Sequence, residues 1–168
     1  MSTLTLPDFL PGTFAIERGT ARDYDALADF HYVARRPATF AGVWVVRFTD
    51  RRARRRVAAV GVLSYPVPSC ASRERFLGLT GSRSENLRFA NAHIRTISRI
   101  VVHPQFRSLG LSTRLVRWLC EHCDTRYVEA MARMSRVHPL FDRAGMTRVE
   151  PIDPDGPVYF IFDREAHS

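Results

Sequence analysis

A strand-like run that leads through a glycine-containing turn into an amphipathic helix constrains this chain more than any other feature. Ile94–Val102 is rich in β-branched apolar residues, as in a central strand that is covered on both faces. A polar turn over Gln105–Gly110 follows, and apolar residues then recur at helical spacing within Leu111–Cys123. The apolar stripe of this predicted helix consists of Leu111, Leu115, Trp118 and Leu119.

The turn before this helix has the properties of an anion site. Backbone N–H groups at a helix start lack partners within the helix, and the helix dipole favours negative charge there. Gly110 permits a positive φ or the close approach of a phosphate, and Arg107 can add positive charge. No Gly-Lys-Ser/Thr follows and the three-glycine pattern is absent, so the turn is neither a Walker loop nor a dinucleotide fingerprint.

The rest of the chain is predicted to alternate between strands and helices. Strands are expected at Phe14–Ile16, Gly42–Phe48, Val57–Tyr65, Tyr127–Met131 and Val158–Phe162. Helices are expected at Ala21–Val33, opened by a capping-box spacing at Thr20–Asp23, and at His138–Ala144. Residues 69–92 are interpreted as a long loop, with Ser84–Asn91 as a candidate short helix. The order predicts a mixed α/β sheet within one domain of 168 residues.

Positive charge is concentrated in one residue type, because all 25 basic residues are arginine and the net charge is +8. Two interpretations stay open: contact with nucleic acid, whose phosphates match the guanidinium fork, and a GC-rich genome that favours arginine codons. Arginines crowd the turn of the hairpin expected between residues 42 and 65. We predict nucleic-acid contact there through Arg51, Arg52, Arg54, Arg55 and Arg56, beside Arg47. The patch would grow if the 69–92 loop folds toward it, through Arg35, Arg36, Arg73, Arg75, Arg83 and Arg88.

Composition excludes several protein classes. With 45% hydrophobic and 25% charged residues, the chain is no disordered tail, collagen-like fibre or disulfide miniprotein. No run reaches the ~20 apolar residues of a membrane helix. Met1–Leu10 carries Asp8 and no arginine, unlike a secretion signal, so a cytoplasmic location is expected.

The three cysteines, Cys70, Cys120 and Cys123, are expected to be reduced thiols. Cys120 and Cys123 have the spacing of half a zinc site, but no second pair is present. Burial on a helix is therefore favoured over metal binding, and no metal is expected.

Two segments resemble the GNAT acyltransferase superfamily. Val102-His-Pro-Gln-Phe-Arg-Ser-Leu-Gly-Leu-Ser112 looks like its acetyl-CoA pyrophosphate loop, and Phe141-Asp-Arg-Ala-Gly-Met146 resembles a later family segment. The resemblance implies a mostly antiparallel central sheet flanked by helices, splayed at its two central parallel strands. It also implies an N-acyltransferase that uses acetyl-CoA or another acyl-CoA. The cofactor would contact Ile100, Val101, Val102, Arg107, Ser108, Leu109, Gly110, Leu111 and Ser112.

The chain departs from the family pattern where acid–base chemistry is usual. Many members carry a glutamate base on the strand before the loop, where this chain has Thr96 and Ser98, and a tyrosine acid where it has Phe141. Candidate replacements are His31 and Tyr32 at the end of the first predicted helix, and Ser98. Glu129 either faces solvent, which we favour, or serves as the base. Weaker candidates are Ser64, Tyr65, His93 and His138, and the spacing gives a metal site of His31, Glu129 and His138 no independent support.

A finer resemblance points toward nucleic acid. His31-Tyr32 and Arg99 are shared with the acetyltransferase-like domain fused to ABC-type ATPases and, more distantly, with Mom DNA-modification proteins. This resemblance implies an exocyclic nucleobase amine as the acyl acceptor. The alternatives are a small or protein amine, a non-catalytic module that binds CoA or nucleic acid, and a zinc-dependent protein using Cys120 and Cys123.

Overall fold

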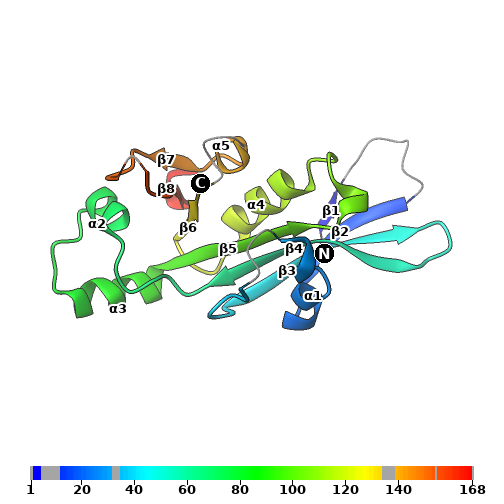
Figure 1. Ribbon diagram of the computed structural model, residues 1–168, viewed down its shortest axis with the longest axis horizontal. Helices are drawn as coiled ribbons and strands as arrows, with labels where there is room; N and C mark the ends of the chain where they lie inside the picture. Colours follow the sequence, from blue (N-terminus) through cyan, green and yellow to red (C-terminus); the bar gives the residue numbers. More distant parts are fainter. Residues whose placement is uncertain (1, 5–11, 32–34, 134–138, 154, 168) are drawn as a thin grey trace.

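The strands form one sheet with helices on both faces (Figure 1). The computed structural model describes residues 2–4, 12–31, 35–133, 139–153 and 155–167. Among these, eight strands are paired in the order β1-β2-β3-β4-β5-β6-β8-β7. The strands are β1 (Ser2–Leu4), β2 (Gly12–Arg18), β3 (Gly42–Asp50), β4 (Arg55–Ser64), β5 (Ile94–Val102), β6 (Tyr127–Ala132), β7 (Thr147–Val149) and β8 (Val158–Asp163). The helices are α1 (Ala21–Asp25), η1 (Ala28–Phe30), α2 (Ala71–Leu77), α3 (Arg83–His93), η2 (Pro104–Phe106), α4 (Leu111–His122), α5 (Leu140–Arg143) and η4 (Glu165–His167).

The sheet opens between β5 and β6, its one parallel pair among the described strands. These strands pair only where Ile94–Thr96 lies beside Tyr127–Glu129. Beyond that point β6 continues its pairing with β8, while the β6-facing edge of β5 from Ile97 onward has no strand partner. The mixed, mostly antiparallel sheet with a splay at two central parallel strands is therefore confirmed.

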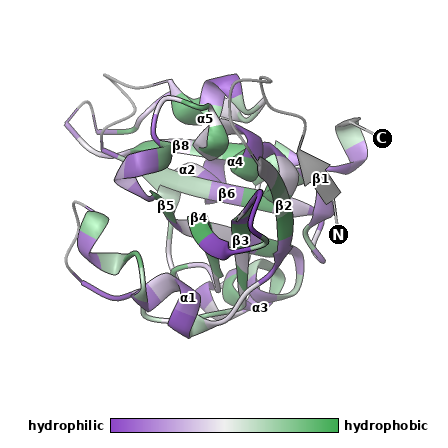
Figure 2. Ribbon diagram, turned by 90° about the vertical axis from the view of Figure 1, so that its right-hand side faces the viewer, coloured by the Kyte–Doolittle hydropathy of each residue, from purple (hydrophilic) through white to green (hydrophobic). Residues whose placement is uncertain are grey.

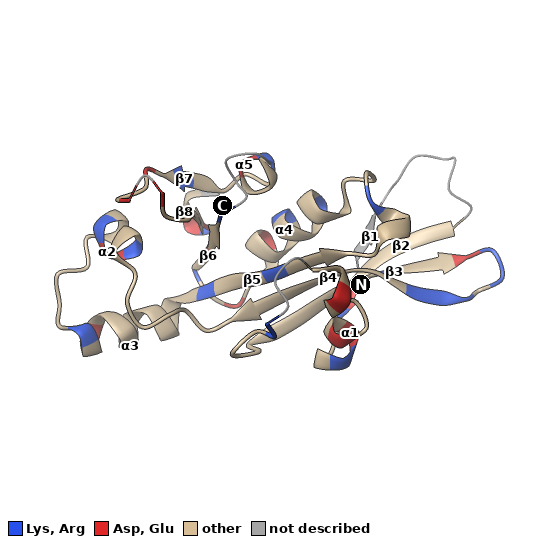
Figure 3. Ribbon diagram, in the orientation of Figure 1, with Lys and Arg blue, Asp and Glu red and all other residues tan. Residues whose placement is uncertain are grey.

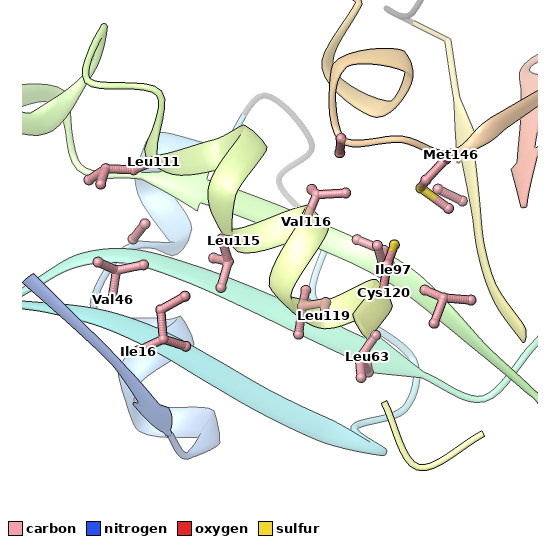
Figure 4. Close-up of a cluster of buried hydrophobic side chains, with 14 of the residues drawn as sticks. Ile16, Val46, Leu63, Ile97, Leu111, Leu115, Val116, Leu119, Cys120 and Met146 are labelled. Atoms are coloured by element: carbon pink, nitrogen blue, oxygen red, sulfur yellow. The ribbon is translucent and has the colours of Figure 1, made fainter. Parts of the chain in front are cut away.

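The helix α4 packs its apolar stripe onto one face of the sheet. Leu111, Leu115 and Leu119 are fully buried, as the spacing predicted. They meet side chains from β2, β3, β4 and β5 (Figure 4), among them Ile16, Val46, Leu63 and Ile97.

The opposite face is covered by α1 and the turn after it. Figure 2 shows α4 and α1 on opposite sides of the strands. Tyr24 and Leu27 pack against a second cluster that includes Val62 and Val101. Since Val101 belongs to this cluster and Ile97 to the α4 cluster, β5 is covered on both faces, as predicted.

Two helix predictions are wrong in extent. The capping box at Thr20 is present, with the Asp23 carboxylate accepting from the Thr20 N–H at 2.8 Å, yet α1 ends at Asp25 instead of Val33. The short turn η1 follows, and Tyr24 and Leu27 are the buried residues of this segment. The helix expected at His138–Ala144 spans Leu140–Arg143, and His138 lies outside the described residues.

The stretch predicted as a long loop over residues 69–92 contains two helices: α3 confirms the candidate short helix at Ser84–Asn91, and α2 was not predicted. The α2 helix ends at Gly78 in the left-handed conformation (φ 63°) that glycine adopts freely. Ser82 and Glu85 form a capping box that begins α3. The short strands β1 and β7, at the two edges of the sheet, were not predicted either.

Candidate active site

The turn before α4 has a left-handed backbone at two positions. Gly110 is the N-cap of α4 with φ 71°, and Ser108 has φ 67°. A Cβ atom at Gly110 would meet no protein atom within 4 Å, so the space beside this backbone is open. Phe106 anchors the turn from below, because its buried ring packs against Phe14 and Phe48.

The turn presents a row of unused backbone donors. Within the part of the chain that the structure describes, no protein acceptor lies within hydrogen-bond distance of the N–H groups of residues 108–113. The next backbone N–H group, that of Arg114, does have an acceptor: it donates to the Gly110 carbonyl at 3.1 Å. These open N–H groups, together with the dipole of α4, can hold an anion such as a diphosphate.

The open edge of β5 leads directly into this turn. Ile97–Val102 is the part of β5 without a β6 partner, and Pro104–Phe106 connects it to the anion-binding turn. An elongated ligand with an anionic group at one end can therefore lie along β5 and place its other end near Ser98. The residues predicted to hold a cofactor, from Ile100 to Ser112, lie together along this path.

The segment containing His31 runs beside the same path. The Phe30 ring contacts the His103 ring at 5.1 Å, and the Arg107 guanidinium lies 3.5 Å from the Phe30 carbonyl. Further along, the Arg35 carbonyl accepts a hydrogen bond from Arg99 on β5. His31, half-buried after η1, lies between these two contact points in the chain, and Tyr32 lies outside the described residues.

Ser98 occupies an irregular position in β5. Val62 pairs with Arg99 and Leu63 with Ile97, so Ser98 is the extra residue of a β-bulge. Its hydroxyl lies 2.7 Å from that of Ser64, which in turn donates to the Thr39 carbonyl at 2.6 Å. A short chain of hydroxyls therefore lies beside the open edge of β5.

Glu129 is fully buried where the two parallel strands part, so the solvent-facing position that we favoured is wrong. Its two carboxylate oxygens accept four hydrogen bonds: two from Arg73, at 2.8 and 2.9 Å, one from Thr96 at 2.7 Å and one from Tyr159 at 2.8 Å. Burial and the neighbouring carboxylate raise the pKa of Tyr159 far above its usual range, so its phenol stays a donor. With every donor directed at it, this carboxylate is better suited to joining elements than to accepting a proton from substrate.

Arg73 was expected to extend an exposed basic patch and is instead fully buried. It extends from α2 to form the bidentate pair with Glu129 on β6, and its remaining nitrogen donates to the Val67 carbonyl at 3.0 Å. Burial opposes the charged form and lowers the pKa of Arg73, but the hydrogen bonds that it donates to Glu129 and the negative charge of that carboxylate raise this pKa above its usual value. No local pattern in the sequence separates this arginine from the exposed ones.

The position where the family pattern has a tyrosine carries no hydroxyl. Phe141, the second residue of α5, is half-buried, with its ring centroid 5.2 Å from that of Phe160. Tyr65, by contrast, is half exposed just after Ser64, and its backbone N–H donates to the Thr39 hydroxyl at 3.1 Å.

Basic residues gather on the hairpin between β3 and β4 (Figure 3), and the partners of these arginines divide them into two groups. Arg54 pairs with Asp50, Arg55 with Glu17, and Arg56 donates to Gln105. Arg51 and Arg52 are exposed at the tip, and among the described residues neither guanidinium forms an ion pair with a carboxylate. The exposed charge is thus smaller than the count of arginines indicates.

Among the described residues, no group of three or more His, Cys, Asp or Glu side chains is placed so that it could hold a metal ion. Burial raises the pKa of the Cys120 thiol to about 12, and Cys123 is buried as well. A search of the described helices likewise finds none that could span a membrane.

Comparisons with known proteins agree on one fold. A model of the acetyltransferase (GNAT) family matches residues 7–146. The GNAT domain of S. lividans PAT superposes with a TM-score of 0.60 at 15% identity, covering 96% of each chain. A GNAT-family acetyltransferase from Listeria monocytogenes 4b F2365 gives 0.57 at 12% identity, over 96% of this chain and 99% of that one.

A further similar structure belongs to an enzyme whose acetylated product is known. Drosophila melanogaster polyamine N-acetyltransferase, which catalyses the formation of N-acetylagmatine, gives a TM-score of 0.53 at 12% identity. The superposition covers 89% of this chain and 99% of that one. At these identities the similarity concerns the fold. No curated protein matches the sequence.

Proposed function

Because the chain belongs to the acetyltransferase (GNAT) family, whose acyl donor is acetyl-CoA or another acyl-CoA, we propose that it transfers an acyl group to an amine. The observation that carries the proposal is the row of open N–H groups at the start of α4, at the end of an unpaired strand edge. These residues fit acyl-CoA. The open N–H groups can donate to its pyrophosphate, and the unpaired edge of β5 can form hydrogen bonds with the amides of its pantetheine arm.

Each predicted cofactor residue then has a binding role. The N–H groups of Ser108–Ser112 would hold the pyrophosphate, with Arg107 adding positive charge. The backbone of Ile100–Val102 would pair with the pantetheine arm. When bound, acyl-CoA supplies the activated acyl group; the protein orients it and holds the acceptor amine.

Proton transfer falls to residues other than the family's usual glutamate and tyrosine. We propose His31 as the proton acceptor, since Phe30 before it contacts Arg107, Arg35 after it contacts Arg99, and imidazole titrates near neutral pH. Tyr32, next to it in the chain, is the proposed donor to the leaving thiolate. Ser98 and Ser64 would hold a proton in the adjoining hydroxyl chain. Because its oxygens already accept four hydrogen bonds, Glu129 is proposed to hold β5, β6, β8 and α2 in place.

A second candidate acceptor is the exocyclic amine of a nucleobase. The exposed Arg51 and Arg52 favour it, together with the resemblance to the ABC-fused domain and the Mom proteins.

Titration calorimetry with acetyl-CoA tests the main proposal. We expect a binding isotherm, followed by CoA release and N-acetylated product once an amine acceptor is supplied. Absence of binding at millimolar acetyl-CoA would refute acyl-CoA chemistry altogether. Binding without CoA release from any amine or nucleic acid would instead support the non-catalytic module.

A further inference from the structure

Arg99 lies on β5 beyond the last pair with β6, on the face opposite α4. Its partner in β4 is Val62, which belongs to the cluster with Tyr24 and Leu27. Leu63 and Ile97, the next pair, belong to the cluster packed under α4. The side chain of Arg99 therefore projects to the side of the sheet that α1 and η1 cover.

The guanidinium of Arg99 is held by neutral groups alone. Nη1 donates to the Ser98 carbonyl at 2.6 Å and Nη2 to the Arg35 carbonyl at 2.5 Å. Nε is buried, and no hydrogen-bond partner for it exists among the described residues. No carboxylate of the described residues forms an ion pair with this arginine, although most partly or fully buried arginines nearby have one, such as Arg73 and Arg47.

A buried N–H donor without an acceptor costs free energy, of the order of a lost hydrogen bond. A guanidinium fixed by two carbonyls is also pre-organised to receive an anionic group, because its planar geometry needs no further ordering. A ligand that supplies a carboxylate or phosphate oxygen at this position would remove the free-energy cost of the unpaired donor.

Arg99 also lies at the level where an acyl group would end. On the proposed function, the pantetheine arm runs along Ile100–Val102 from the anion-binding turn, so the acyl end lies next to Ser98 and Arg99. The buried carboxylate of the same face, Glu129, is already neutralised by Arg73. The charge left without a counter-ion beside the acyl end is positive.

We propose that Arg99 determines acceptor specificity by binding a carboxylate or phosphate carried by the amine substrate. The inference rests on the proposed function and deepens it, since it assigns the acceptor to the class of anionic amines. A purely cationic acceptor, such as the agmatine of the fly enzyme's description, would meet an uncompensated guanidinium here. Carboxylate and phosphate share the chemistry that a guanidinium recognises, and the experiment separates them.

The test compares amines that differ only in the anionic group. Lysine is paired with cadaverine, arginine with agmatine, and O-phosphoethanolamine with ethanolamine, and CoA release is followed by chromatography. We expect kcat/KM for the anionic member of at least one pair to exceed that of its partner by about tenfold or more, chiefly through KM. The pair that responds shows whether the acceptor carries a carboxylate or a phosphate.

Variants connect that preference to the residue. Arg99→Met should bring the ratio of kcat/KM within the responding pair close to one, and Arg99→Lys, which keeps the charge without the fork, should leave an intermediate ratio. Arg88→Met on the exposed face of α3 is the matched control, with the ratio of the wild type expected. Thermal unfolding of each variant verifies that it is folded. The comparison of paired amines with the wild-type protein tests the preference even if a variant fails to fold.

The outcomes separate this inference from the function on which it rests. If acetyl-CoA binds but no anionic amine outpaces its partner, or if Arg99→Met keeps the wild-type ratio, the inference is overturned and the acyltransferase proposal stands. If acetyl-CoA fails to bind and no amine releases CoA, both are overturned together.

Discussion

The environment of Glu129 illustrates how burial decides what a carboxylate can do. A carboxylate with free oxygens beside a cofactor site can accept a proton. A buried, charged carboxylate is stable only when an opposite charge and hydrogen-bond donors surround it. Here Arg73 supplies the charge, and Thr96 and Tyr159 supply the remaining donors. The pair also holds α2, a helix of seven residues, against the sheet.

We therefore predict that Glu129→Ala destabilises the fold by about 3–5 kcal/mol, because it leaves the buried Arg73 guanidinium unpaired. Replacing both partners, with Arg73→Met and Glu129→Leu, should cost much less than the single change. Denaturant unfolding measures both, with the exposed Glu121→Ala on α4 as the control. A loss below about 1 kcal/mol for Glu129→Ala would contradict a structural role for the pair.

At the scale of elements, the first turn of α4 is the part on which the proposed function depends. Ser112 occupies its second position, where a negative charge interacts favourably with the helix dipole. Ser112→Asp should keep the free energy of unfolding or raise it by up to about 1 kcal/mol. The same carboxylate would occupy the anion position and weaken acetyl-CoA binding by about tenfold or more.

Calorimetry and thermal unfolding, carried out on the same sample, separate these two effects. Ser112→Ala serves as the control and should change both quantities little. Unaltered acetyl-CoA affinity in Ser112→Asp would mean that the pyrophosphate lies elsewhere.

Arg47 joins three elements, since its guanidinium on β3 reaches Glu17 of β2 at 2.5 Å and Asp23 of α1 at 2.7 Å. Burial alone would raise the pKa of both carboxyls. Hydrogen bonds from Arg47 and Arg55 lower the pKa of Glu17 below its ordinary value of 4.5, and hydrogen bonds from the Thr20 backbone and Arg47 lower that of Asp23 below 3.8. A carboxyl whose pKa is lower in the folded state stabilises the fold above its ordinary pKa. That stabilisation is lost as the pH falls through the folded-state pKa.

The expected result is that the wild type loses stability as the pH falls below about 4.5, and that Arg47→Met loses less over the same range. Denaturant unfolding at a series of pH values measures this, with Arg88→Met as the control. Parallel curves for Arg47→Met and the wild type would show that these pairs do not contribute to the pH dependence.

At the scale of the whole molecule, the excess of positive charge bears on the choice between nucleic acid and small amines as acceptors. Ion pairs neutralise part of the charge on the β3–β4 hairpin, and Arg51 and Arg52 remain at its tip (Figure 3). The hairpin projects at one end of the molecule, and α3 lies toward the other (Figure 1). Surface arginines on α3 therefore provide a charge-matched control.

If the hairpin contacts DNA, retention on immobilised DNA should fall with salt, and Arg51→Ala with Arg52→Ala should reduce the slope of log K against log salt by about two. Arg83→Ala with Arg88→Ala removes the same charge from α3 and should leave that slope nearly unchanged. No retention at low ionic strength, or equal slopes for the two double variants, would favour the codon interpretation of the arginine excess. The cytoplasmic location stays a prediction.

The sequence by itself determined the features that are encoded over short distances along the chain. The apolar run of β5, the spacing along α4 and the glycine turn at Gly110 follow from local pattern, and the family resemblance implied the splayed sheet. The candidate helix at Ser84–Asn91 was also found locally, and the Ser82–Glu85 capping box marks where α3 begins. Backbone propensity and hydrophobic periodicity act within a few residues, so one sequence suffices to detect them.

Only the tertiary structure decided which polar side chains meet. Arg73 and Glu129 are 56 residues apart and form a buried pair, while Arg99 lies beside the Arg35 carbonyl, 64 residues away, with its Nε unpartnered. Nothing near either arginine in the chain distinguishes it from those on the surface. Its charge state, burial and partner depend on how β5, β6 and α2 pack, and that packing is set by contacts far apart in the sequence.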